Sequence, residues 1–286
     1  STITIFELAP DGKLLRRHSH SIPGFSFIHD FAITPHYCIF FQNPVNFNPL
    51  PFLLGIRGAG ECVEFQPGKP TRVVLIPRDP KNKEVKIFEV DSGFVFHHAN
   101  AFEKENQVCI DSIAYASLPQ VQADANYKEA DFDKLDPGKL WRFTLNLQDG
   151  TVERKLVEPC CCEFPTIHPD RVGRDYRYLF MGAAHQDTGR NAPLQAILKL
   201  DWETGEKQSH SFAPHGYVSE PIFVPRQGGK QEDEGWVLTL VYDGKNHRST
   251  LAILDAQNIE GDAVALLHLK HHIPYGLHGS WTDSVF

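Results

Sequence analysis

Short apolar runs separated by turn residues follow one another along almost the whole chain, and helical periodicity is nearly absent. A hairpin is expected wherever an alternating run meets a turn residue pair such as Asp-Gly or Thr-Gly and a second run follows. Five such hairpins are expected, at residues 3–8 with 13–17, 73–77 with 85–90, 140–147 with 152–157, 197–201 with the run after 205, and 251–254 with 264–269. The pattern therefore predicts an all-β protein.

The spacing of these hairpins indicates the architecture. Their turns lie roughly 55–70 residues apart, which is typical of large repeats of antiparallel strands. A β-sandwich needs turns about every 8–12 residues, whereas a β-propeller blade uses four strands and presents an outer hairpin. We therefore expect residues 1–286 to form part of a single β-propeller domain with about five blade units. The polar stretches 120–138 and 227–234 are expected to be surface loops or short helices.

Composition narrows the possible partners and surroundings. The 286 residues are 41% hydrophobic and 22% charged, as in a globular protein, and the net charge of −8 argues against nucleic acid as a partner. Apolar runs such as 73–76 are far shorter than the roughly 20 residues that cross a bilayer. Three of the six cysteines are consecutive, at 160–162, and neighbours on a strand point to opposite faces. Reduced thiols and a cytoplasmic location are therefore expected.

Three histidines lie in apolar contexts that predict inner strands near the propeller axis: His29, His97 and His278. Any one of them alone is more typical of a hydrogen-bonded core histidine than of a ligand. Together, coming from different repeats, they suggest convergence on an axial metal ion. Ligation by nitrogen alone suits iron, copper, nickel or zinc better than magnesium or calcium.

Five ordered segments together resemble the carotenoid cleavage oxygenases. The resemblance covers essentially the whole chain, and its motifs are FIHDFAIT at 27–34, FHHANAFE at 96–103, EFP at 163–165, SEPIFV at 219–224 and YGLHG at 275–279. It implies a seven-bladed β-propeller that holds Fe(II) on its axis through four histidines, with glutamates behind three of them.

Carried over by motif, the resemblance implies His29, His97 and His278 as metal ligands, with Glu163 and Glu220 behind them. His97 is preferred to its neighbour at 98 because relatives keep the first position of the pair. Relatives are much longer, and their first histidine ligand and one glutamate precede the region represented here. The resemblance therefore implies that residues 1–286 are the C-terminal part of a propeller whose N-terminal blades and fourth ligand lie upstream.

The implied activity is cleavage of a conjugated C=C bond of an apocarotenoid with O2, giving two carbonyl products that include retinal. A carboxylate that accepts the distal N–H of a ligating imidazole fixes its tautomer and raises its basicity. Two alternatives stay open at this point. One is a propeller hydrolase with a divalent metal on carboxylates and asparagines, and the other is a non-catalytic propeller that binds a protein or lipid.

Two apolar features each have two interpretations. Phe27, Phe96 and Phe164 adjoin the motifs and are expected either to pack in the core or to line a tunnel for a polyene substrate. The segment 44–56 concentrates apolar residues between prolines and asparagines, where no regular strand is expected. It either tucks into its own domain or contacts a membrane peripherally to collect lipid-soluble substrate.

Overall fold

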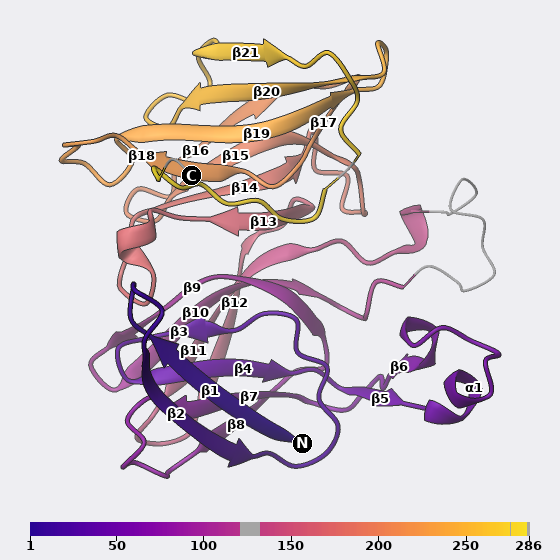
Figure 1. Cartoon of the computed structure of the whole chain (residues 1–286), viewed down its shortest axis with the longest axis vertical. Helices are drawn as coiled ribbons and strands as arrows, with labels where there is room; N and C mark the ends of the chain where they lie inside the picture. The colour runs from indigo at the N-terminus through magenta and orange to yellow at the C-terminus, as the bar shows by residue number, and fades with distance from the viewer. Residues whose placement is uncertain (121–131, 275, 285–286) are drawn as a thin grey trace.

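A computed structural model describes residues 1–120, 132–274 and 276–284 (Figure 1). These residues form six antiparallel β-sheets, of which five follow one another in a row and the sixth is a small two-stranded sheet. The first sheet contains β1 (Thr2–Leu8) and β2 (Leu14–Ser21). The second contains β3 (Ala32–Ile33), β4 (Tyr37–Gln42), β7 (Thr71–Pro77) and β8 (Lys86–Val90). The third sheet contains β9 (Phe94–Lys104), β10 (Gln107–Tyr115), β11 (Lys139–Asn146) and β12 (Val152–Glu158). The fourth contains β13 (Cys162–Thr166), β14 (Tyr178–Ala184), β15 (Leu194–Asp201) and β16 (Lys207–Ser211). The fifth contains β17 (Gly216–Val218), β18 (Ile222–Pro225), β19 (Gly235–Asp243), β20 (Arg248–Asp255) and β21 (Ala265–His268).

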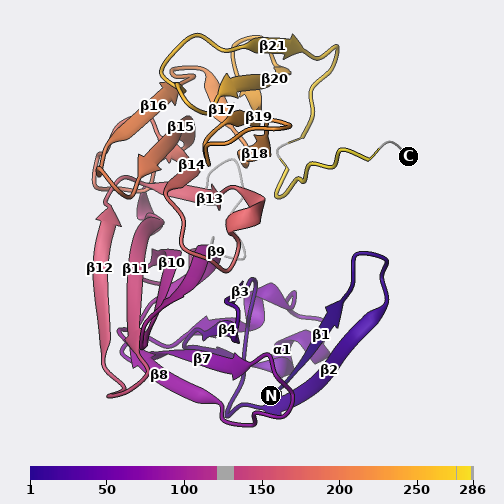
Figure 2. The same cartoon turned by 90° about the vertical axis from the view of Figure 1, so that its left-hand side faces the viewer.

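The sheets are arranged as blades along an arc. Figure 2 shows that β9 and β13 lie toward the concave side, whereas β12 and β16 lie on the periphery. Each of the five expected hairpins is present, as β1–β2, β7–β8, β11–β12, β15–β16 and β20–β21. The prediction of an all-β, propeller-type fold with about five units is therefore confirmed.

Apolar clusters between neighbouring sheets hold the blades together. On β4, Ile39 and Phe41 pack with residues of the third sheet, while Cys38 and Phe40 face the first. Successive side chains on a strand point to opposite faces, so a blade buried on both faces needs a continuous apolar run. Full burial of each such side chain contributes about 1.5–3 kcal/mol. The same requirement explains the unbroken apolar run in β7.

The segment 44–56 differs from its prediction. It contains a short strand, β5 (Val45–Phe47), which pairs with β6 (Val63–Phe65), and then a short helix, α1 (Pro49–Leu53). The prediction that this segment forms no strand is wrong. The strand β6, which begins 16 residues after the end of β5, supplies the hydrogen-bonding partner that β5 needs. The helix begins where the Asn48 side chain accepts the N–H of Leu50.

The helix α1 and its neighbours do not tuck into the domain. The exposed fractions of Leu50, Phe52, Leu53, Leu54 and Ile56 lie between 48% and 74%. In Figure 1 this segment projects from the body of the protein beside β5 and β6. None of the helices in the described ranges has the length and apolar character needed to cross a bilayer.

Short 3-10 helices interrupt the connections at Gly60–Cys62, Phe132–Lys134 and Pro169–Arg171. The stretch 227–234 is a loop, as predicted. Of the stretch 120–138, positions 121–131 lie outside the described residues. All six cysteines are unpaired.

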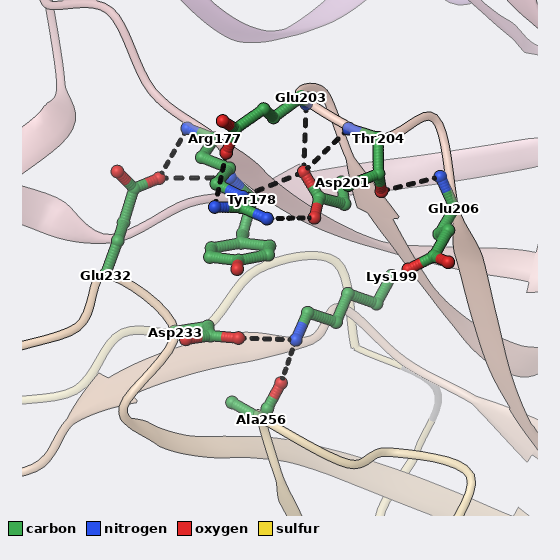
Figure 3. A network of polar contacts seen from close by, with 10 residues as sticks. All are labelled: Arg177, Tyr178, Lys199, Asp201, Glu203, Thr204, Glu206, Glu232, Asp233 and Ala256. Atoms are coloured by element: carbon green, nitrogen blue, oxygen red, sulfur yellow. Dashed lines mark hydrogen bonds and ion pairs between the residues drawn. The ribbon is translucent and has the colours of Figure 1, made fainter.

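A buried ion pair joins the fourth sheet to the fifth (Figure 3). Lys199 Nζ on β15 donates to Asp233 Oδ2 and to the carbonyl oxygen of Ala256, each at 2.7 Å. The side chains of Lys199 and Asp233 are 5% and 7% exposed. Next to Asp233, the Glu232 carboxylate accepts the backbone N–H of Arg177 at 2.7 Å. The loop that precedes β19 is therefore fixed to the fourth sheet by two adjacent carboxylates.

Candidate metal centre

Three imidazoles converge on the concave side of the arc. His29 lies in the connection before β3, His97 on β9, and His278 in the segment after β21. One ring nitrogen of each lies within 4.8 Å of those of the other two. Nitrogens bound to one ion at about 2.0–2.1 Å lie roughly 3–4 Å apart, so the cluster needs little rearrangement to hold a metal.

Only one of these histidines sits on a strand, which corrects the prediction for the other two. His97 is on β9, but residues 22–31 and 269–284, which carry His29 and His278, form no strand in the part of the chain described. Near His29, the Asp30 carboxylate accepts the N–H of Phe31, so a side chain replaces a ladder contact. Near His278, Pro274 offers no N–H to a sheet.

Glu163 determines the tautomer of His97. Its Oε2 lies 2.6 Å from His97 Nδ1, which donates to the carboxylate. The other ring nitrogen, Nε2, is buried and has no hydrogen-bond partner among the described residues. A buried polar atom without a partner costs about 1–3 kcal/mol, and a metal ion would satisfy this one. The residues present therefore fit a metal ion ligated by nitrogen.

Three donors in turn hold Glu163. Besides His97, the hydroxyl of Tyr115 donates to Oε1 at 2.8 Å, and the N–H of Phe164 donates to Oε2 at 2.5 Å. Phe164 has a φ of 56°, in the left-handed region that non-glycine residues rarely adopt, and the ladder shifts register between Glu163 and Thr166. This bulge folds the Phe164 N–H back onto the preceding side chain.

Glu220 makes a looser contact with the third histidine. Glu220 Oε1 lies 3.2 Å from His278 Nδ1, and Oε2 accepts the N–H of Gly279 at 2.7 Å. The glutamate lies between β17 and β18, just before Pro221. Because both the imidazole and the adjacent backbone bind one carboxylate, Glu220 fixes the position of the segment that follows β21.

The electrostatics differ among the imidazoles. Desolvation, followed by repulsion from His97 and His278, lowers the pKa of His29, which favours the neutral form that a metal needs. At His97 burial also lowers the pKa, but the hydrogen bond and charge of Glu163 outweigh it, so the pKa is raised overall.

His98 has a separate environment. Burial lowers the pKa of His98 to about 4, and its Nδ1 lies 2.7 Å from Ser112 Oγ. The strand alternation of β9 therefore places His97, and not His98, in the cluster.

Two of the three predicted aromatics contact the imidazoles of the cluster directly. The ring centroid of Phe164 is 5.4 Å from that of His97, and the Phe96 centroid is 5.4 Å from that of His29. Phe27 packs against Phe94 at 6.1 Å, and Phe94 in turn packs against Phe96 at 4.6 Å.

The cluster borders a pocket of about 430 Å³. A mainly apolar pocket of about 390 Å³ lies on the other side of Glu163, lined by residues that include Tyr115, Cys161 and Leu194. Phe164 lines both pockets.

Two contributors to the centre were missed from sequence. Tyr115 has no local signal, because it ends an apolar strand like many core tyrosines. Asp30 stands next to a predicted ligand, but its role depends on a contact with β9 that only the fold creates.

Comparison with known proteins places the chain among proteins of similar sequence and structure. The family model described as retinal pigment epithelial membrane protein matches residues 1–283. Apocarotenoid-15,15'-oxygenase of Synechocystis sp. is 59% identical, with 99% of this chain aligned to 57% of that protein. Carotenoid 9,10(9',10')-cleavage dioxygenase of Crocus sativus is 27% identical, over 98% and 53% of the two chains.

The structural comparison agrees. The crystal structure of cobalt-substituted Synechocystis apocarotenoid oxygenase matches with a TM-score of 0.95 and 59% identity, over 99% of this chain and 58% of that one. The chain thus spans a little over half the length of these relatives.

Proposed function

Because the chain belongs to the retinal pigment epithelial membrane protein family, which includes the carotenoid cleavage oxygenases, we propose that it carries most of the centre of an Fe(II)-dependent apocarotenoid oxygenase. The reaction is cleavage of a conjugated C=C bond with O2 to give two carbonyl products, retinal among them. The observation that carries this proposal is the convergence of His29, His97 and His278.

The proposed ligands are the three imidazoles, and the proposed positioning groups are Glu163 and Glu220. Nitrogen donors suit iron better than calcium, and the unpartnered Nε2 of His97 supplies one of them. When bound, Fe(II) would supply the activation of O2. Glu163 would keep the proton of His97 on Nδ1, so that the Nε2 lone pair stays available to the ion.

The surroundings of the cluster suit an apolar, conjugated substrate. We propose that Phe164, Phe96 and Phe27 contact the polyene, since the first two each lie 5.4 Å from an imidazole of the cluster and Phe27 packs against Phe94 beside Phe96. The mainly apolar pocket behind Glu163 adds a second apolar wall. A mainly apolar wall of this kind favours flat apolar ligands, while the imidazoles line the adjoining pocket. A carboxylate-based hydrolase finds less support, because the candidate ligands in the described ranges are all imidazoles.

The test is reconstitution of the protein at its full natural length after its metal has been removed. Fe(II) is expected to restore cleavage of an apocarotenoid, with equal consumption of O2 and formation of aldehyde, whereas Ca(II) is expected to restore nothing. Oxygen uptake and the absorbance of the aldehyde measure the two quantities. Cleavage that proceeds with Ca(II), or without O2, would contradict the proposal.

We also propose that residues 44–56 contact a membrane peripherally. Three neighbouring side chains, Phe52, Leu53 and Leu54, are 48%, 74% and 62% exposed on α1 and its C-cap. Each gains about 1.5–3 kcal/mol when it leaves water, so the triple variant F52S/L53S/L54S is expected to lower partition onto liposomes at least tenfold. Co-sedimentation with phospholipid vesicles measures the partition.

The matched control for this prediction is the double variant L266S/L267S. These residues are 49% and 46% exposed on β21, so the variant removes exposed apolar side chains from a part of the protein far from α1 (Figure 1). They are expected to leave liposome partition unchanged. Turnover of detergent-dispersed substrate should be the same in the parent and in both variants. Equal partition of all three proteins would contradict the proposal and would mean that residues 44–56 form an ordinary surface loop.

A further inference from the structure

Asp30 ties the backbone that carries one candidate ligand to the strand that carries another. Its Oδ2 accepts the backbone N–H of His98 on β9 at 2.9 Å, and its Oδ1 accepts the N–H of Phe31 at 2.7 Å. Residues 22–31 form no strand, so ladder hydrogen bonds do not fix the position of His29. The Asp30 carboxylate therefore supplies a direct link between this connection and the inner strand of the third sheet.

The register of this link aligns the two candidate ligands. His29 and Asp30 are adjacent, and so are His97 and His98. The hydrogen bond joins the second member of each pair, which brings the first members together with ring centroids 5.1 Å apart. A shift of β9 by one residue would move the His97 imidazole to the opposite face of the strand.

The strand end of the link is itself well fixed. The His98 ring packs against Phe41 with centroids 4.9 Å apart, and its Nδ1 contacts Ser112 Oγ at 2.7 Å on β10. Phe41 belongs to the core between the second and third sheets. The N–H that Asp30 binds thus lies on backbone anchored by that core.

We propose that Asp30 is a positioning residue that sets the distance between His29 and His97 before a metal ion binds. This inference rests on the proposed metal centre. The His29 side chain is exposed, and an unrestrained backbone beside it would have to be ordered by the ion at an entropic cost. Asp30 removes much of that cost because it holds the connection in place in the metal-free protein.

The test is titration of the metal-free protein, at its full natural length, with Co(II). Loss of an outer contact that orients a ligand typically weakens metal affinity 10–100-fold. D30N keeps one acceptor oxygen but turns the other position into a donor, so we expect about a tenfold weaker affinity, and up to about 100-fold for D30A. The visible absorption bands of the bound Co(II) should also shift, because the field at the ion depends on how His29 is held.

The matched control is D187N. Asp187 likewise accepts a backbone N–H, that of Gly189 at 2.9 Å, but it lies in an exposed turn and is not a member of the histidine cluster found in the described part of the chain. We expect its Co(II) affinity and spectrum to equal those of the parent.

A double-mutant cycle separates positioning from general folding. If Asp30 acts through His29, then D30N should weaken Co(II) binding in the parent and have no further effect in H29A. Additive losses in the double variant would overturn the proposal. It would also be overturned if D30N and D30A lowered the unfolding temperature of the metal-free protein while retaining the parent affinity and spectrum. A parent that binds no Co(II) would instead refute the proposed metal centre on which the inference rests.

Discussion

Replacing Lys199 by methionine is expected to lower the free energy of unfolding by about 3–5 kcal/mol. The substitution leaves the Asp233 carboxylate and the carbonyl oxygen of Ala256 without the ammonium group that binds both at 2.7 Å. The two side chains are almost completely buried, so water cannot replace the lost contacts at little cost. Equilibrium unfolding in urea, with the protein at its full natural length, measures the difference.

Two further variants establish whether the unpaired charge causes the loss. K199M/D233L removes both charges, and we expect it to recover much of the stability, because apolar residues often replace a buried ion pair without cost. K86M removes a similar contact at the surface, where Lys86 Nζ lies 2.7 Å from Glu84 Oε1, and we expect a change below about 1 kcal/mol. A loss in K199M no larger than in K86M would mean that the buried pair has little part in joining the two sheets.

Removal of the His97 imidazole is expected to have the largest effect on metal content and activity. H97A should reduce both to background, because this residue offers the buried Nε2. E163Q keeps an acceptor but loses the charge that supports His97, so we expect a 10–100-fold loss in metal affinity or turnover. E220Q is expected to lose less, because its contact with His278 is longer, 3.2 Å against 2.6 Å.

The control for this series is another histidine–glutamate contact. Glu103 Oε2 lies 2.7 Å from Nδ1 of His36, which is exposed and is not in the cluster. E103Q should therefore retain the metal content and the initial rate of the parent. Metal analysis of the purified proteins and initial rates of cleavage provide the two readouts. Full metal retention in H97A, or an E220Q loss that exceeds the E163Q loss, would contradict the proposed arrangement.

The fold could be predicted from sequence because its signals are local. Each outer hairpin has its turn residues within a few positions, and an apolar run such as that of β7 records burial on both faces. The segment 44–56 was less predictable, since β5 is three residues long and its partner lies beyond α1. Very short strands depend on their neighbours more than on their own composition.

The candidate site was only partly predictable. The histidines were selected by their apolar contexts and by motif resemblance, but His29 and His278 were expected on strands and lie in connections. The carboxylates of Asp30 and Glu220 accept backbone N–H groups beside these two histidines, where a strand would otherwise pair. Such contacts leave no pattern of hydrophobic and polar residues in the sequence. Tyr115 and Asp30 form hydrogen bonds with residues distant in sequence, so these contacts could be seen only in the fold.

Because the three imidazoles come from distant parts of the chain, a metal ion bound to them would also hold the blades together mechanically. His29 precedes the second sheet and His278 follows the last strand of the fifth, so an ion bound to both would cross-link two points about 250 residues apart. Such a cross-link restricts the unfolded chain in the way that a disulfide does. It would also keep the second sheet and the fifth at a fixed separation. Metal supply would then control how firmly the blades stay assembled, by mass action, as well as whether the centre can react.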